Sequence, residues 1–302
     1  WFEKVAASYN GDSCFARVGQ SASGHFVKMV HNGIEYALMQ LIAEVYQLLR
    51  LGTNRSPKKV AEIFNDWSEG QLNSYLLSIS SHILSLENHN NVPLADLIDN
   101  KVGAKGTGLW TAQNALELGI AVPSLVAAVQ ARHLTNACNT TAAQEMTYAS
   151  KSTNNVEIDL EELKDAFLLA SLLAYRQGLA LIKGASRTHQ WKVDLSKTLQ
   201  TWRAGCIIRA DYLDSVAQGV EFIDTLEKES NSLRKITGQA IMTGLAFPVL
   251  GATQTYLATL TTPSNGHLVQ AQRDYFGEHG IKTHSGEMCH LTDLVDIDAK
   301  VR

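Results

Sequence analysis

The sequence predicts a mainly α protein whose core is one large helical domain. Apolar residues recur at helical spacing through most of the chain between residues 26 and 258. Helix start signals accompany several of these segments, because Ser56-Pro57 and Val122-Pro123 each place a proline near a first helical turn. Convincing alternating strands are scarce after residue 20. Together these three observations favour an all-helical core.

The periodicity predicts its helices in a definite order. The expected segments are residues 26–51, 57–66, 69–86, 111–119, 123–138, 160–183, 196–209, 214–226 and 230–258. Asp159 precedes Glu161 and Glu162, so acidic side chains stand where a helix N-terminus favours them. Residues 236–266 contain no Asp, Glu, Lys or Arg, but Thr, Gln, Gly and Pro248 lower their apolar density too far for a membrane span. We therefore expect a buried helix there and no membrane partner.

The two ends of the chain have other patterns. Residues 13–19 alternate apolar and polar side chains and close on glycine, which predicts one strand. A single strand forms no sheet, so it pairs with another chain or belongs to a domain that lies upstream. From about residue 266 the helical pattern lapses, and residues 280–302 have the composition of an irregular polar tail.

Composition argues against several classes of function. The 302 residues carry a net charge of −4 without a basic block, so we expect no general nucleic-acid binding. An anionic partner must then be met by a few placed cations. The four cysteines share no close spacing, which favours a reducing compartment over a disulfide framework or a zinc module. Three dispersed donors near the C-terminus, His284, Cys289 and His290, do not predict a metal site.

A polar stripe on one helix is the first candidate site. His31, Asn32, Glu35 and Tyr36 follow Lys28 at offsets of three, four, seven and eight, so all five share one face. Apolar residues flank the stripe closely, and we expect it not to be freely solvated. A plain surface stripe with a Lys–Glu pair would contribute only a few tenths of a kcal/mol. A functional stripe would offer a general base and a general acid, provided that burial shifts the two pKa values towards neutrality.

Three further segments carry candidate groups. Lys105–Thr111 sets glycines on both sides of Thr107 just ahead of a helix, which suits an anion but is also common in ordinary loops. Arg132 lies near the end of an apolar helix, where a cation interacting with the helix C-terminus is the simpler alternative. Arg273 and His279 lie outside any strong amphipathic pattern.

With Trp202–Arg209, these segments resemble the C-terminal part of decarboxylating 6-phosphogluconate dehydrogenases. The longest matches are His-Phe-Val-Lys-Met-Val-His-Asn-Gly-Ile-Glu-Tyr, within Gly24–Tyr36, and Gln-Ala-Gln-Arg-Asp-Tyr-Phe-Gly, over Gln270–Gly277. The resemblance keeps the family order over most of the chain. It implies that residues 1–20 are the tail end of an NADP-binding Rossmann-type domain whose upstream part is absent here.

The same resemblance implies the remaining organisation. Residues 21–265 would form the all-helical domain of the family. Residues 266–302 would form a C-terminal tail that reaches the partner subunit, and such a tail implies a homodimer.

The resemblance also implies an activity and a role for each matched residue. The family oxidises 6-phosphogluconate at C3 with NADP and then releases CO2 to give ribulose 5-phosphate, a cytoplasmic reaction of the pentose phosphate pathway that uses no metal. Lys28 would accept the 3-hydroxyl proton, and Glu35 would protonate the enediol at C1 after decarboxylation. The substrate-binding positions would be His31, Asn32, Tyr36, Lys105, Thr107 and Arg132, joined by Arg273 and His279 from the other subunit.

A second class of function stays open. The chain could be a non-catalytic structural or dimerisation subunit derived from that enzyme, because the upstream region is absent and some positions depart from the family pattern. The departures are Ala22–Gly24, Ala37-Leu38, Leu109 and Thr255–Leu260. They affect subunit packing and pocket edges rather than the main catalytic positions.

Overall fold

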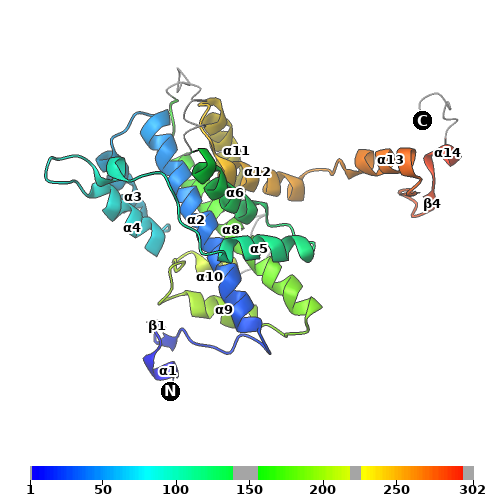
Figure 1. Ribbon diagram of the computed structural model, residues 1–302, viewed down its shortest axis with the longest axis horizontal. Helices are drawn as coiled ribbons and strands as arrows, with labels where there is room; N and C mark the ends of the chain where they lie inside the picture. The colour runs from blue at the N-terminus through cyan, green and yellow to red at the C-terminus, as the bar shows by residue number, and fades with distance from the viewer. Residues whose placement is uncertain (1, 139–155, 218–225, 295–302) are drawn as a thin grey trace. The chain divides into compact units, whose positions relative to one another are not determined.

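Helices dominate the computed structural model, which describes residues 2–138, 156–217 and 226–294 (Figure 1). The mainly α prediction is confirmed. The chain divides into two compact units, residues 1–256 and 257–302. The helices of the first unit are α1 (Phe2–Val5), α2 (Ser23–Gln47), α3 (Pro57–Ser68), α4 (Tyr75–Ser85), α5 (Thr107–Glu117), α6 (Pro123–Cys138), α8 (Leu160–Thr188), α9 (Leu195–Trp202), α10 (Leu213–Ala217) and α11 (Glu227–Met242), and α12 (Pro248–Thr261) contains the division.

Helix α2 is the central element of the first unit. It packs against α4, α5, α6 and α8 and continues into a π-helical turn at Leu48–Gly52. Its apolar residues Val30 and Ile34 are fully buried. Gly178 of α8 permits the close approach of the two longest helices, since a Cβ there would lie 2.6 Å from Ile34 Cγ1 and 3.2 Å from Val30 Cγ1. The core therefore surrounds the helix that carries the polar stripe.

Helix α8 is long and apolar enough to cross a membrane by length and composition alone. Within its most apolar window, 78% of the residues are buried inside the protein. Burial of that extent is typical of a core helix, and α2, α6, α10 and α11 supply the cover.

The helix starts expected from capping signals are confirmed. Pro57 is the first residue of α3, and the Ser56 side chain accepts a hydrogen bond from the Lys59 amide. Asp159 caps α8 by accepting from the amides of Glu161 and Glu162. Such caps satisfy amides that the first helical turn leaves without partners.

The predicted strand at residues 13–19 is wrong for most of its length. Ser8–Tyr9 (β1) pairs antiparallel with Asp12–Ser13 (β2), and residues 14–18 have no regular structure. Asn10 and Gly11 both adopt positive φ, as a two-residue hairpin turn requires. The strand partner is therefore local, and the Asn-Gly pair was the sequence signal for it.

Several helix boundaries need correction. Residues 69–74 do not belong to α4, since Ser74 forms an isolated bridge with Ala210 before the helix begins. The helix expected over 196–209 ends at Trp202. Of the helix expected over 214–226, residues 214–217 belong to α10, residue 226 is not helical, and residues 218–225 lie outside the described part of the chain.

The single helix expected over 230–258 is two helices. The chain turns between Met242 and Pro248, and α12 then starts on its proline. The buried Glu44 carboxylate of α2 accepts hydrogen bonds from the amides of Val249 and Leu250, both at 2.9 Å. Because these amides have no helical partner, the carboxylate fixes where α12 begins.

The second unit is more ordered than an irregular tail. Helix α13 (Gly266–Gly277) is followed by the hairpin of β3 (Ile281–Lys282) and β4 (Met288–Cys289) and by α14 (Leu291–Leu294). The expected lapse of helix from residue 266 is therefore wrong. Leu268, Ala271 and Tyr275 stand at helical spacing but in a short segment bounded by glycines, and among the α13 residues only Asp274 is buried.

We expect Gly178→Ala to destabilise the first unit by about 1–3 kcal/mol, because the added methyl would overlap buried Ile34. The matched control is Gly238→Ala on α11, where a Cβ meets nothing within 4 Å and should stabilise by about 0.5–1 kcal/mol. Urea unfolding of both variants measures the difference. Equal stabilities would contradict close packing of α2 on α8.

Candidate functional site

The polar stripe of α2 runs from solvent into the protein. Lys28 is exposed, Asn32 and Glu35 are half-buried, and only 2% of His31 and 7% of Tyr36 remain exposed. The expectation that the stripe is withdrawn from solvent holds for four of its residues and is wrong for Lys28. Position along the helix is not the reason, since Phe26 and Val27 lie nearer the helix start and are buried, and Lys28 is exposed because its side of this turn is left uncovered by the described residues.

Lys28 joins two of its neighbours in one network. Its Nζ donates to Asn32 Oδ1 at 2.8 Å and lies 3.1 Å from His31 Nδ1. An ammonium has only donors, so the imidazole Nδ1 accepts and its proton resides on Nε2. That Nε2 is buried and has no hydrogen-bond partner among the described residues. The network therefore presents an ammonium and an unpaired ring N–H.

His31 is held in its neutral form. Burial, followed by the positive charge of Lys28, lowers the pKa of His31 to about 4. Asn32 Oδ1, 3.2 Å from Nδ1, would accept a hydrogen bond from the protonated ring and so acts in the opposite direction. Trp202 contacts the imidazole edge-on, with ring centroids 5.9 Å apart. The ring is therefore a fixed neutral hydrogen-bonding group at neutral pH.

Glu35 differs from an ordinary surface carboxylate. Burial raises its pKa, although the charges of Lys28 and Arg132 act to lower it. A raised pKa favours the protonated form, which is the form that a general acid requires. The direction expected from the sequence is therefore present for Glu35.

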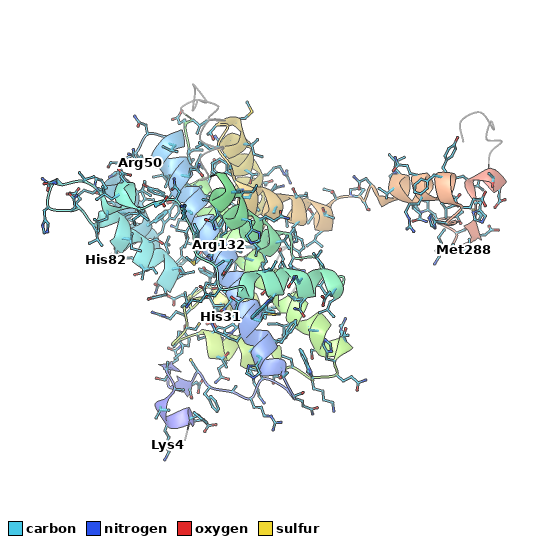
Figure 2. The ribbon with its side chains drawn as sticks, viewed as in Figure 1. Lys4, His31, Arg50, His82, Arg132 and Met288 are labelled. Carbon is cyan, nitrogen blue, oxygen red and sulfur yellow. The ribbon has the colours of Figure 1, made fainter. Side chains whose placement is uncertain are left out.

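Tyr36 and Arg132 form the next part of the site, and Figure 2 labels Arg132 on the ribbon. The Arg132 guanidinium carbon lies 3.4 Å from the centroid of the Tyr36 ring, in cation–π geometry. Arg132 is 9% exposed and comes from α6, where it also donates to the Gly103 carbonyl at 3.4 Å. Burial lowers its pKa, but a guanidinium stays charged at neutral pH. A nearly buried cation thus lies beside the stripe.

The start of α5 is packed directly on Tyr36. A Cβ at Gly108 would lie 2.6 Å from Tyr36 Cε2, so only glycine permits this approach. Thr111 Oγ1 donates to the Met29 carbonyl at 2.9 Å and fixes α5 on α2. Thr107 is the first residue of α5 and is half-buried, and Lys105 is exposed just before it. The fold therefore brings this loop to the Tyr36 and Arg132 pair.

Arg273 and His279 belong to the second unit. Arg273 is exposed on α13 and donates from Nη1 to Gln270 Oε1 at 3.2 Å. His279 is exposed after the helix and contacts Phe276 edge-on, with centroids 6.2 Å apart. The other eight predicted residues all lie in the first unit.

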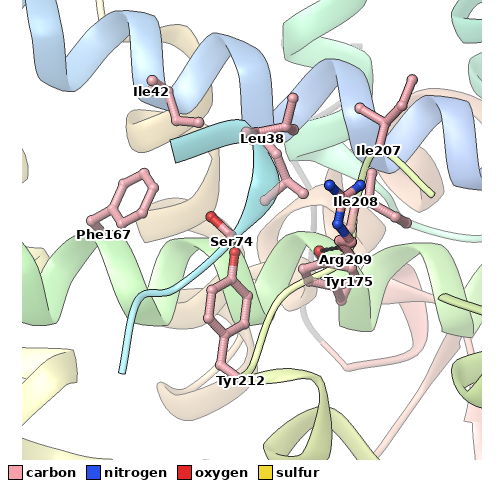
Figure 3. Close-up of a pocket in the computed structure, with 10 residues that line it drawn as sticks. Leu38, Ile42, Ser74, Phe167, Tyr175, Ile207, Ile208, Arg209 and Tyr212 are labelled. Atoms are coloured by element: carbon pink, nitrogen blue, oxygen red, sulfur yellow. Dashed lines mark hydrogen bonds between the residues drawn. The ribbon is translucent and has the colours of Figure 1, made fainter. Parts of the chain in front are cut away.

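Residues 203–209 support the site as an irregular segment, where the helical periodicity predicts a helix. The buried Tyr175 hydroxyl donates to the Ile208 carbonyl, and Arg209 stacks 3.8 Å from the Tyr75 ring centroid. The cavity under this segment, shown in Figure 3, measures about 10 Å³. Such a space is about the size of one water. The segment is therefore a packed support, and Trp202, just before it, contacts His31.

Metal-ligating side chains do not gather at the site. Within the described ranges, no group of three or more His, Cys, Asp or Glu residues converges as an ion would require.

We expect the His31 imidazole to titrate with a midpoint near pH 4. This pKa lies below the usual 6.5, so His31 contributes stability above pH 6.5 that is lost as pH falls towards 4. Lys28→Met should raise the midpoint, although burial keeps it below 6.5, while Lys28→Arg retains the charge and serves as the control. NMR titration of the ring resonances measures all three, and a wild-type midpoint near 6.5 would refute the buried neutral ring.

Known proteins are similar to this chain over most of its length. A family model described as 6-phosphogluconate dehydrogenase, C-terminal domain, matches residues 24–293. The NAD(+)-dependent decarboxylating 6-phosphogluconate dehydrogenase of Bacillus subtilis is 36% identical over 295 residues, which cover 91% of this chain and 63% of that protein. The decarboxylating enzyme of Schizosaccharomyces pombe is 35% identical over 306 residues, covering 92% of this chain and 60% of the relative.

A solved structure is similar throughout the fold. The 6-phosphogluconate dehydrogenase of Plasmodium falciparum, studied in its apo form, with its cofactor NADP+ and with its substrate 6-phosphogluconate, aligns with a TM-score of 0.88 and 36% identity. The alignment covers 95% of this chain and 66% of that one. The chain thus spans a little under two thirds of the length of these relatives. The match over residues 24–293 shows that the chain belongs to the 6-phosphogluconate dehydrogenase family and contains its C-terminal domain.

Proposed function

We propose that the protein carrying this chain oxidises and decarboxylates 6-phosphogluconate to ribulose 5-phosphate and CO2, with reduction of NADP. The observation that carries the proposal is the arrangement on α2, where Lys28 and Glu35 share a face beside the Tyr36 and Arg132 pair. One end of this face can exchange protons, and the other offers a cation to a phosphate. Relatives named for this activity support the proposal.

Lys28 is the proposed base. Its Nζ would take the proton of the 3-hydroxyl while a hydride leaves C3, which gives a 3-keto acid. A lysine accepts a proton only in its neutral form. Bound substrate and coenzyme would cover the exposed Lys28 and disfavour its charged form by desolvation. Asn32 and His31 hold the amine through its hydrogen bonds and so fix where the proton is received.

Glu35 is the proposed acid. Loss of CO2 from the 3-keto acid leaves the enediolate anion, and a proton delivered to its C1 completes ribulose 5-phosphate. The carboxyl is half-buried and its pKa is raised, so it can hold a proton that a surface glutamate would release. The two proton-transfer groups lie seven residues apart, or two helical turns, on the same face.

The phosphate site is proposed to combine Arg132 with the start of α5. Arg132 is already desolvated and stacked on Tyr36, which reduces the conformational entropy lost on binding an anion. Lys105 would add a second cation and Thr107 a hydroxyl at a helix start, where amides favour anions. An acidic protein meets a phosphosugar by such a local cluster.

A nicotinamide coenzyme would accept the hydride from C3. The chain contains no Gly-x-Gly-x-x-Gly motif, so its residues fit the reactive end of the coenzyme rather than its nucleotide half. The buried, unpartnered His31 Nε2 and the half-buried Asn32 are the polar groups on the described part of the stripe that suit it. We propose NADP, the cofactor of the Plasmodium enzyme, whereas the B. subtilis relative is named NAD(+)-dependent. Comparing kcat/KM for the two coenzymes decides between them.

Arg273 and His279 are proposed to complete the phosphate pocket from the partner of a homodimer. Their exposure in the second unit leaves both side chains accessible to an anion.

The domain division is also proposed as the sequence predicts it, with residues 1–20, 21–265 and 266–302 as separate parts. We also propose a cytoplasmic location, which is compatible with the free thiols of Cys14, Cys206 and Cys289.

We expect Lys28→Met to reduce kcat by at least about a hundredfold, because the reaction loses its general base. Binding of 6-phosphogluconate, measured by calorimetry, should stay detectable. The matched control is Lys59→Met, which removes an exposed lysine on α3 that pairs with Glu62. The assay follows NADPH formation by the protein expressed with its upstream coding sequence. Turnover of Lys28→Met near the wild-type rate would contradict the role of Lys28, and a folded wild type without turnover would favour the non-catalytic alternative.

Mixing two variants that each show little turnover at low substrate concentration tests the shared site. In a refolded equal mixture of Lys28→Met and Arg273→Ala, half of the dimers are mixed and each has one of two sites intact, so about a quarter of wild-type activity should return. If both residues of a site came from one subunit, no intact site would form. Each variant refolded alone is the control, and a mixture no more active than the controls would contradict the partner contribution.

A further inference from the structure

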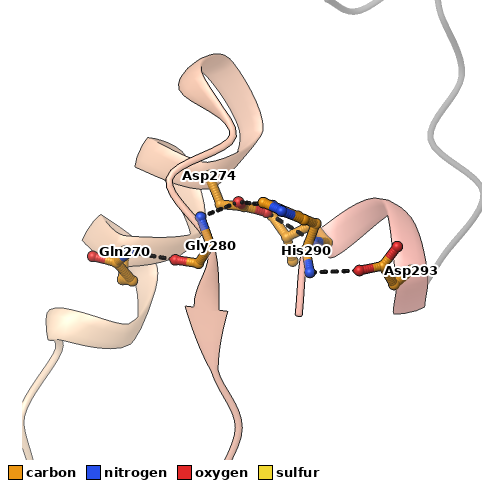
Figure 4. A network of polar contacts seen from close by, with 6 residues as sticks. Gln270, Asp274, Gly280, His290 and Asp293 are labelled. Carbon is orange, nitrogen blue, oxygen red and sulfur yellow. Dashed lines mark hydrogen bonds and ion pairs between the residues drawn. The ribbon is translucent and has the colours of Figure 1, made fainter. Parts of the chain in front are cut away.

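One buried carboxylate organises the second unit (Figure 4). Asp274 of α13 is 3% exposed. Its Oδ1 accepts from the Gly280 amide at 2.7 Å and lies 2.8 Å from His290 Nδ1, and its Oδ2 accepts from the Leu291 amide at 2.7 Å. These donors hold the pKa of Asp274 below its usual value. A single side chain thus connects the end of α13, the segment after it and the start of α14.

Gln270 acts from one helical turn earlier. Its Nε2 donates to the Gly280 carbonyl at 2.6 Å, and its Oε1 accepts from Arg273 Nη1 at 3.2 Å. Both peptide groups of Gly280 are therefore bonded to α13, the N–H through Asp274 and the carbonyl through Gln270. His279 is the residue immediately before Gly280, so the same contacts restrain it.

The backbone around His279 requires such restraint. Glu278 has φ of 51° and Gly280 has φ of 77°, so His279 lies between two residues in the left-handed region. Left-handed conformations of non-glycine residues persist where surrounding contacts determine them. Here the contacts are the two hydrogen bonds to Gly280 and the helix-ending bond from the Glu278 amide to the Asp274 carbonyl at 2.8 Å.

We propose that Gln270 and Asp274 are positioning residues that hold Arg273 and His279 in fixed relation as an anion-binding pair. Gln270 orients the guanidinium directly, and Asp274 with Gln270 fixes the backbone that presents the imidazole. The inference rests on the proposed function, because the pair's anion is the phosphate of the substrate. Gln270 and Asp274 themselves do not contact the substrate in this proposal, because their polar atoms are bonded to other groups of the same unit.

Asp274→Asn tests the proposal with little change of shape. An amide keeps one acceptor oxygen and turns the other into an NH2 group, which then faces an N–H donor of Gly280 or Leu291. Glu287→Gln is the matched control, an exposed carboxylate in the same unit. Hydrogen exchange in the intact protein should accelerate at residues 279–280 and 290–291 in Asp274→Asn and stay unchanged in Glu287→Gln.

Kinetics separate positioning from general stability. Asp274→Asn should raise KM for 6-phosphogluconate about tenfold or more, the value of one charge-assisted hydrogen bond, and leave KM for NADP and kcat within about twofold. Adding Asp274→Asn to Arg273→Ala should raise KM far less than it does in the wild type, because the residue it positions is absent.

Two results would overturn the proposal. One is unchanged hydrogen exchange in Asp274→Asn, which counts against it whether or not the protein turns over the substrate. The other is a KM effect that multiplies fully with that of Arg273→Ala. A wild type with protected amides but no turnover of 6-phosphogluconate would instead overturn the proposed function, and the pair would lose its assigned anion.

Discussion

The close packing of α2 against its neighbours is the constraint on which the first unit depends. Gly178 of α8 lies against Ile34, and Gly108 of α5 lies against Tyr36, so both neighbours approach α2 more closely than a side chain would allow. The first contact builds the core, and the second sets the edge of the candidate site. One helix therefore serves as the centre of the hydrophobic core on one face and as the polar stripe on another.

This packing determines the chemistry of the stripe. His31 is almost fully buried beside the Lys28 ammonium, so desolvation and charge both favour its neutral form. Glu35 is half-buried, and the same desolvation favours its protonated form. Arg132 remains charged at neutral pH, and its guanidinium rests on the Tyr36 ring. Graded exposure along one helix thus shifts the pKa of His31 down and the pKa of Glu35 up.

The second unit is held together differently. Its helix α13 buries only one of its residues, Asp274, and polar contacts from Asp274 and Gln270 replace an apolar core. Such contacts are directional, so they fix backbone geometry around His279 more closely than apolar packing of this small unit would. The proposed phosphate-binding pair would then depend on hydrogen bonds, while the proposed catalytic pair depends on burial.

The sequence by itself determined the helical class, the helix starts at Pro57 and after Asp159, and the common face of Lys28 and Glu35, because periodicity and capping are local properties. It did not reveal α13, a short helix whose apolar residues Leu268 and Phe276 stay exposed, or the break before Pro248, which the distant Glu44 carboxylate stabilises. Only the tertiary structure decided that Lys28 is exposed and His31 buried, and that Arg132 stacks on Tyr36. Exposure depends on which helices cover a residue, and contacts between residues far apart in the chain have no signature in local spacing.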